Sequence, residues 1–219
     1  SDYEYYTNSG PEICVASTKV FTAQCAWGYL LAMVLVKQYK EAQMNIKKLT
    51  RQLSKLFTKE ALAQTKSVGN LMKKKDHAFI LGKGENSCIA LEGALKIKEI
   101  SYKHVEGFAA GELKHGVIAL IEKGTVVFGI MPEKKHNESS DLISAMEQVK
   151  SRGALTIGVG SKDFQKNEVF DRYIVVPQIE NISSIANVIP FQLISYYLSL
   201  ALGNNIDKPR NLAKSVTVK

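Results

Sequence analysis

The sequence predicts an α/β fold, a doubly wound parallel sheet flanked by helices. Short apolar runs alternate with helix-like segments from about residue 75 to the C-terminal region. In the segment before residue 75, apolar residues at a spacing near 3.6 predict helices. Strands that alternate with helices form right-handed βαβ units around a parallel sheet. Ligands of such a sheet bind at the carboxyl ends of its strands.

The N-terminal part is predicted to be helical. Ser17 or Thr18 can cap an apolar helix that runs to about Lys40, and helical spacing predicts two amphipathic stretches near 49–57 and 62–68. The uncharged run within the first helix contains polar side chains and falls short of the ~18–20 strongly apolar residues that a membrane span needs. We therefore expect no membrane segment there, but a buried helix that could lie at a subunit interface.

The elements of the sheet region follow in order along the chain. The predicted strands are 77–81, 125–131, 155–159 and 173–176. The predicted helices are 87–103, 139–151 and 183–202, and a loop is expected over 105–116.

An internal similarity suggests a duplicated architecture. When the chain is shifted by 168 positions, five identities fall between residues 12–30 and 180–198. Two apolar helices can match this well by chance, and that alternative stays open. Our interpretation is the helical end of a truncated first module over 1–65, a complete second module over 66–203 and a C-terminal tail over 204–219.

Composition narrows the class of protein. The chain has 219 residues and a net charge of +8, but its lysines are scattered and no recognition motif accompanies them, so we expect no nucleic-acid partner. The three cysteines form no metal-ligand pattern, which predicts no disulfide framework and no metal site. Free thiols and the absence of a signal peptide favour a cytoplasmic protein.

The helix at 87–103 carries the strongest chemical pattern. Glu92, Lys96 and Glu99 follow one another at helical spacing and share one face. A solvated face with ordinary ion pairs is the simpler interpretation. The functional interpretation is a carboxylate base held by a lysine at the mouth of the sheet.

Three other features could carry chemistry. The Gly82-x-Gly84 turn with Ser87 could hold a phosphate, but the glycine fingerprint is incomplete and a tight turn is the preferred interpretation. His115 lies between polar neighbours and could act as an acid or base, or could be structural. Lys214 stands among small residues in the tail, where a lowered pKa would make it an amine nucleophile.

Four strings resemble the glucosamine-6-phosphate synthase family, the glutamine–fructose-6-phosphate aminotransferases. They are ICVASTKVFT, LGKGENSCIALEGALKIKEISY, AAGELKHG and PRNLAKSVTV, and the match covers essentially the whole chain. The resemblance is to the later part of that family's isomerase half, which is built from two SIS (sugar isomerase) modules. It implies a SIS-type sheet preceded by the helical end of a first SIS module, with that module and a glutaminase domain upstream.

The resemblance also implies roles for individual residues. Glu99 would move a proton between C1 and C2 of the sugar, with Lys96 and Glu92 in the same site. His115 would open the sugar ring from the neighbouring subunit, and Lys214 would form an imine with the keto-sugar. The residues that would line the sugar are Val15, Ala16 and Ser17.

The implied reaction converts fructose 6-phosphate and glutamine into glucosamine 6-phosphate and glutamate, in a homodimer, without a metal or other cofactor. The sequence departs from the family at Cys14, Val117 and Lys219, and it contains neither the glutaminase cysteine nor the phosphate-binding loop of the first SIS module. Two alternatives stay open. One is a related SIS-family phosphosugar deglycase or isomerase, and the other is a non-catalytic SIS module that senses a sugar phosphate.

Overall fold

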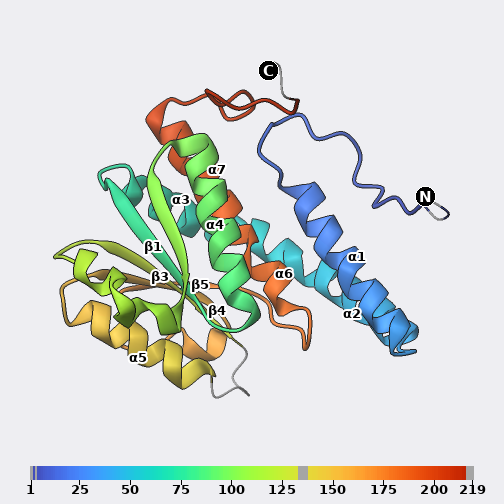
Figure 1. Ribbon diagram of the computed structural model, residues 1–219, viewed down its shortest axis with the longest axis horizontal. Coiled ribbons are helices and arrows are strands. Elements are labelled where there is room, and N and C mark those ends of the chain that lie inside the picture. The colour runs from blue at the N-terminus through green and yellow to red at the C-terminus, as the bar shows by residue number, and fades with distance from the viewer. Residues whose placement is uncertain (1, 3, 133–137, 216–219) are drawn as a thin grey trace.

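A computed structural model describes residues 2, 4–132 and 138–215 and contains one five-stranded sheet (Figure 1). All neighbouring strands are parallel, in the order β2-β1-β3-β4-β5. The strands are β1 His77–Gly82, β2 His104–Ala109, β3 Val126–Met131, β4 Leu155–Gly160 and β5 Arg172–Val175. The order reverses between β1 and β3, which makes their carboxyl ends the topological switch point. The predicted fold class is confirmed.

Helices cover both faces of this sheet (Figure 1). The helices on one face are α3 Lys59–Met72, α4 Glu85–Ser101, α6 Ser183–Asn187 and α7 Ile189–Leu202. The other face is covered by α5 Glu138–Lys150 and by the 3-10 turns η2 Ala110–His115 and η3 Val117–Leu120. The N-terminal helices are α1 Lys19–Leu35 and α2 Tyr39–Leu53, followed by η1 Ser54–Phe57, and a short η4 covers Lys162–Phe164.

The two cores follow from the alternation of side chains along buried strands. In β1, Ala78 and Ile80 point to the face of α3, α4 and α7, whereas Phe79 and Leu81 point to the face of α5. All four side chains are at most 3% exposed, as expected for strands covered on both faces.

One predicted loop is a strand. Residues His104–Ala109 form β2 at the edge of the sheet and pair in parallel with β1, so the loop expected over 105–116 is wrong in its first part. Glu106 and Gly107 interrupt the apolar pattern of this segment, which hides the strand from a search for apolar runs.

The N-terminal helix is shorter and more exposed than expected. It ends at Leu35, because Lys37 adopts a left-handed backbone with φ of 63°, and a second helix starts at Tyr39. Met33 is the one buried residue of α1, while Leu31 is 43% exposed, so the helix is not buried within this chain, and its place at a subunit interface stays a prediction.

The predicted helix at 183–202 is two helices, α6 and α7, with Pro190 in the first turn of the second. Together they are long and apolar enough to cross a membrane by length and composition alone. Both helices contribute buried residues to the core, and α7 packs against α3 and α4. Burial in the core of the domain accounts for this apolar composition.

Gly107 allows α4 to approach β2, and its replacement tests this packing. A Cβ at this position would overlap the main chain of Ala90 in α4. We expect Gly107→Ala to lower the free energy of unfolding by about 2–3 kcal/mol, the upper part of the range for overpacked cores, because the obstacle is backbone. Urea denaturation measures the change. The control Gly28→Ala on α1 meets nothing within 4 Å and is expected to gain a little stability. Equal stability of Gly107→Ala and the parent chain would contradict this packing.

Candidate functional site

The shared face of α4 carries a compact charged cluster. Lys96 is 3% exposed, and its Nζ lies 2.6 Å from Glu99 Oε2 and 3.4 Å from Glu92 Oε1. A buried ammonium must be paired with an opposite charge, which explains why two carboxylates flank it. Although Glu99 Oε2 forms this close ion pair, the buried oxygen has no hydrogen bond of good geometry. The ion pair with Lys96 is thus the interaction that offsets the burial of this oxygen.

The electrostatics of the cluster suit acid–base chemistry. Burial raises the pKa of Glu92, the charge and hydrogen bond of Lys96 oppose the rise, and the Glu99 carboxylate adds to it. One cation thus serves two partly buried carboxylates, at Glu92 and Glu99. Burial of this kind is one way in which enzymes raise the pKa of a carboxyl group that acts as an acid or base.

The cluster does not lie at the mouth of the sheet. The helix α4 starts just beyond the end of β1 and finishes just before the start of β2, so it runs antiparallel to both strands. Glu99 lies in its last turn, near the amino edge of the sheet, whereas the switch point lies at the carboxyl edge. The predicted position at the mouth of the sheet is wrong. Helical spacing shows which residues share a face of the helix, but not which end of the helix lies at the carboxyl edge of the sheet.

At the switch point the glycines make a tight turn. Gly84 caps α4 with a φ of 56°, and a Cβ on Gly82 would overlap the main chain of Asn86. The Ser87 hydroxyl donates to the carbonyl of Gly84 at 2.6 Å. These contacts occupy the groups that would cradle a phosphate, so the structure favours the tight turn.

A segment before α1 meets the C-terminal tail (Figure 1). The Val15 N–H donates to the Asp207 carbonyl at 3.3 Å, and the Cys14 thiol donates to the Ile206 carbonyl at 2.8 Å. Ala16 is 3% exposed beside them. The predicted sugar-lining residues therefore lie against the tail that carries the predicted amine, although about 190 positions separate them in the sequence.

Lys214 is tied to the same segment through Glu12. Its ammonium donates to the Glu12 carbonyl, while the Glu12 carboxylate accepts from the Thr18 N–H at 2.7 Å. Burial acts to raise the pKa of the Glu12 carboxyl. Hydrogen bonds from Thr18 and Ser17 outweigh burial, so this pKa is lowered. Glu12 thus caps α1 with its carboxylate and accepts a hydrogen bond from Lys214 with its main-chain carbonyl.

The tail also approaches the charged cluster. Burial raises the pKa of the Cys14 thiol, a hydrogen bond from the Ala16 main chain lowers it, and the charges of Asp207, Glu12 and Glu99 add to the rise. The tail contacts the C-terminal end of α4 directly: the Asn204 side chain donates to the Ile100 carbonyl at 3.0 Å, and the Arg210 N–H donates to the Tyr102 hydroxyl at 2.8 Å. The tail therefore links the segment before α1 to the C-terminal end of α4.

His115 stands apart from this site. It ends η2 and is exposed, and its neighbour Leu113 is buried in the core on the α5 face. Glu99 is carried by α4 on the opposite face of the sheet. Within one chain, the sheet separates the histidine from the charged cluster.

Comparisons with known proteins bear on these residues. The SIS domain model matches residues 71–202, which is more than half of the chain. The chain belongs to the SIS domain family. A glutamine–fructose-6-phosphate aminotransferase (isomerizing) from Thermococcus kodakarensis is 41% identical over 226 residues, which cover 100% of this chain and 37% of the relative. The chain thus spans little more than a third of the length of this curated relative.

Two solved structures extend the SIS comparison. The C-terminal domain of glucosamine-fructose-6-phosphate aminotransferase from Francisella tularensis has a TM-score of 0.79 and 30% identity, covering 92% of this chain and 59% of that one. A glucosamine-6-phosphate deaminase from Thermotoga maritima has a TM-score of 0.62 and 25% identity, covering 94% and 59%. The SIS fold is shared with both proteins.

Sequence reasoning missed the position of Glu12 in this SIS chain. We expected Ser17 or Thr18 to cap α1, and Thr18 is the N-cap residue, but its side chain makes no capping bond. The carboxylate of Glu12 accepts from its N–H instead. An acidic residue shortly before an apolar helix was the available signal, because helix N-termini favour negative charge.

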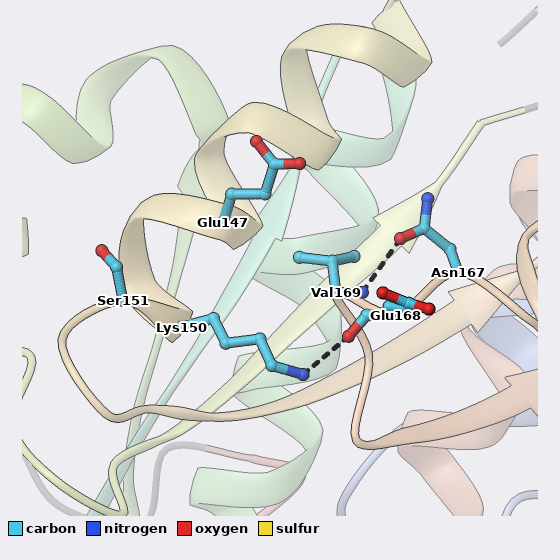
Figure 2. A pocket seen from close by; sticks show the side chains of 6 residues that line it. All are labelled: Glu147, Lys150, Ser151, Asn167, Glu168 and Val169. Atoms are coloured by element: carbon cyan, nitrogen blue, oxygen red, sulfur yellow. Dashed lines mark hydrogen bonds between the residues drawn. The ribbon is translucent and has the colours of Figure 1, made fainter.

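A pocket at the end of α5 is a poor alternative site (Figure 2). Figure 2 shows the Lys150 ammonium bonded to the Glu168 carbonyl, and the Asn167 side chain accepting from the Val169 N–H. Lys150 also pairs with Asp171 at 2.9 Å. These polar groups already hold the loop before β5 in place, so few of them are available to a ligand.

Proposed function

We propose that this chain is the C-terminal part of the isomerase half of a glucosamine-6-phosphate synthase. It would convert D-fructose 6-phosphate and glutamine-derived ammonia into D-glucosamine 6-phosphate. The observation that carries the proposal is that the Lys214 tail contacts both the segment before α1 and the end of α4, the helix that carries the Glu92–Lys96–Glu99 cluster. The proposed reaction needs an amine and a carboxylate base to act on one sugar, and this contact supports that requirement.

The proposal includes an arrangement of domains. Residues 1–65 would end a first SIS module, residues 66–203 would form the second, and 204–219 would be an active-site tail, whose last four residues lie outside the described part of the chain. A glutaminase domain and the rest of the first module would precede them. The greater length of the related aminotransferases supports this arrangement.

The steps of the proposed reaction can be assigned to residues in the order in which the steps occur. After the ring opens, the amine of Lys214 condenses with the ketone at C2, releasing water and forming an imine. Ammonia then displaces the lysine amine. Glu99 takes a proton from C1 and returns one to C2, and Lys96 stabilises its carboxylate between the two steps. Val15, Ala16 and Ser17 would line the sugar, and Glu92 would hold Lys96 from the other side.

His115 would act from the partner subunit of a homodimer. The sheet separates it from Glu99 within one chain, and a two-fold interface exchanges matching loops between subunits. We expect mixed dimers of Glu99→Gln and His115→Ala chains of the complete enzyme to regain activity, because one of their two sites then has both intact groups. With random exchange, half of the dimers are mixed, so recovery should approach roughly a quarter of the wild-type rate.

Subunit exchange must be verified independently in this experiment, for example by mass spectrometry of differently labelled chains. Exchange without recovery would mean that His115 works within its own chain or has no catalytic role.

A product assay separates the proposed function from a deglycase. The fold is shared with a deaminase, so the same base and lysine could serve the reverse chemistry. We expect the complete enzyme to form glucosamine 6-phosphate from fructose 6-phosphate and glutamine, with glutamate as co-product. Release of ammonia from glucosamine 6-phosphate, with no glutamine-dependent synthesis, would favour the deglycase.

A further inference from the structure

The residue that ends α4 has an unusual backbone for its type. Tyr102 follows the last helical residue with a left-handed φ of 61°, and its N–H donates to the Lys98 carbonyl at 3.1 Å. Glycine is the usual residue at such a helix end, because its lack of a Cβ removes the steric cost. A tyrosine in this conformation therefore points to a role for its side chain.

The Tyr102 side chain holds one residue of the C-terminal tail at two places. Its hydroxyl accepts a hydrogen bond from the Arg210 main-chain N–H at 2.8 Å. The central guanidinium carbon of Arg210 lies 4.2 Å from the centroid of the tyrosine ring, within the range of a cation–π interaction. One side chain at the end of α4 thus binds both the main chain and the side chain of Arg210.

Other contacts hold the tail further from Lys214. The Asn204 side chain donates to a carbonyl in the last turn of α4 at 3.0 Å, and Asn205 Oδ1 accepts from the Lys208 N–H at 2.9 Å. Among the residues that the structure describes, the hydrogen bond of Arg210 is the one between the tail and the end of α4 that lies closest in sequence to Lys214.

The position of this anchor limits where the amine of Lys214 can go. An extended chain spans at most about 3.6 Å per residue, so the four positions from Arg210 to Lys214 allow about 14 Å between their Cα atoms. If the tail were held only up to Lys208, six positions would allow about 21 Å. Tyr102 itself lies three positions after Glu99, less than one helical turn away. The anchor therefore limits the separation of the proposed amine and the proposed base.

The hydrogen bond between Lys214 and the Glu12 carbonyl cannot take over this task during the reaction. To attack a ketone, the amine must turn from this carbonyl to the sugar. The contact of Arg210 with Tyr102 involves neither the amine nor the carboxylate base, so it can persist while they react.

We propose that Tyr102 positions Lys214 for the ketone of the sugar by anchoring Arg210 at the end of α4. This role rests on the proposed function, because it requires an imine on Lys214. Tyr102 acts through the tail and takes no part in the reaction itself, so it is a positioning residue. Restricting the amine to a small volume near the base raises its effective concentration at the ketone.

Two variants of the complete enzyme remove the anchor in steps. Tyr102→Phe removes the hydroxyl and leaves the ring beside Arg210, whereas Tyr102→Gly removes both and suits the left-handed backbone. Quenching with borohydride at successive times gives the rate of imine formation at saturating fructose 6-phosphate. We expect this rate to fall about fivefold in Tyr102→Phe, the size of one lost hydrogen bond, and about thirtyfold in Tyr102→Gly, which also loses the cation–π contact. The sugar concentration that gives half the maximal rate should stay the same, because the anchor does not bind the sugar.

Hydrogen–deuterium exchange without substrate tests the anchor independently of catalysis. Peptides that cover residues 204–215 should exchange faster in both variants, because the Arg210 N–H loses its acceptor. Tyr196→Phe is the matched control, since it removes the same hydroxyl from a tyrosine on α7 that is 41% exposed. We expect this control to match the wild type in exchange and in imine formation. Thermal melting checks that each variant folds.

The outcomes separate this role from the proposed function. Imine formation at the wild-type rate in both Tyr102 variants, unchanged exchange of the tail, or equal losses in Tyr102→Phe and Tyr196→Phe would overturn the positioning role and leave the imine on Lys214 intact. Absence of any sugar adduct in the wild-type enzyme would overturn the proposed function, and the role of Tyr102 with it. If Tyr102→Gly does not fold, Tyr102→Phe decides the question, because it keeps the ring.

Discussion

Glu99→Gln is expected to reduce glucosamine 6-phosphate formation by the complete enzyme about 10²–10⁴-fold, the usual cost of losing a positioned general base. The carboxamide keeps the shape of the side chain beside Lys96 but cannot take the proton from C1. Product formation measured by mass spectrometry gives the rate. Glu85→Gln is the matched control, because Glu85 is exposed at the other end of the same helix.

Hydrogen exchange locates the lost step in this variant. In deuterated water, the Glu99→Gln enzyme should still form the imine but should not exchange the C1 protons of fructose 6-phosphate with solvent. Deuterium entering the sugar at the wild-type rate would refute the role of Glu99 as the base.

Lys214→Ala is expected to bring synthesis down to the background of the assay, because alanine offers no amine to capture the ketone. Lys214→Arg should be equally inactive, since a guanidinium keeps the charge but is not a nucleophile at neutral pH. Lys208→Ala controls for disturbance of the tail, because this exposed lysine lies six residues earlier. Activity of Lys214→Arg near that of the wild type would remove the lysine from the mechanism.

The sheet was predictable wherever its strands are apolar throughout. Runs such as residues 77–81 and 125–131 predicted β1 and β3 to within a residue. The edge strand β2 was not, because Glu106 and Gly107 break the pattern. The end of α1 also escaped prediction, because an apolar sequence does not reveal the left-handed turn at Lys37.

The candidate site was only half predictable. Helical spacing placed Glu92, Lys96 and Glu99 on one face, and the structure confirms their contacts. Spacing could not show that the Lys214 tail meets Glu12, because that contact joins residues 202 positions apart. Only the folded chain brings such segments together.

The central claim is that Lys214 forms an imine with fructose 6-phosphate beside the cluster on α4. Borohydride reduction of the complete enzyme with this sugar, followed by intact-mass measurement and peptide mapping, tests it directly. The account predicts one reduced sugar-phosphate adduct per chain, on Lys214, in both the wild type and Glu99→Gln. An adduct of equal yield in Lys214→Arg, or none in the wild type, would contradict it.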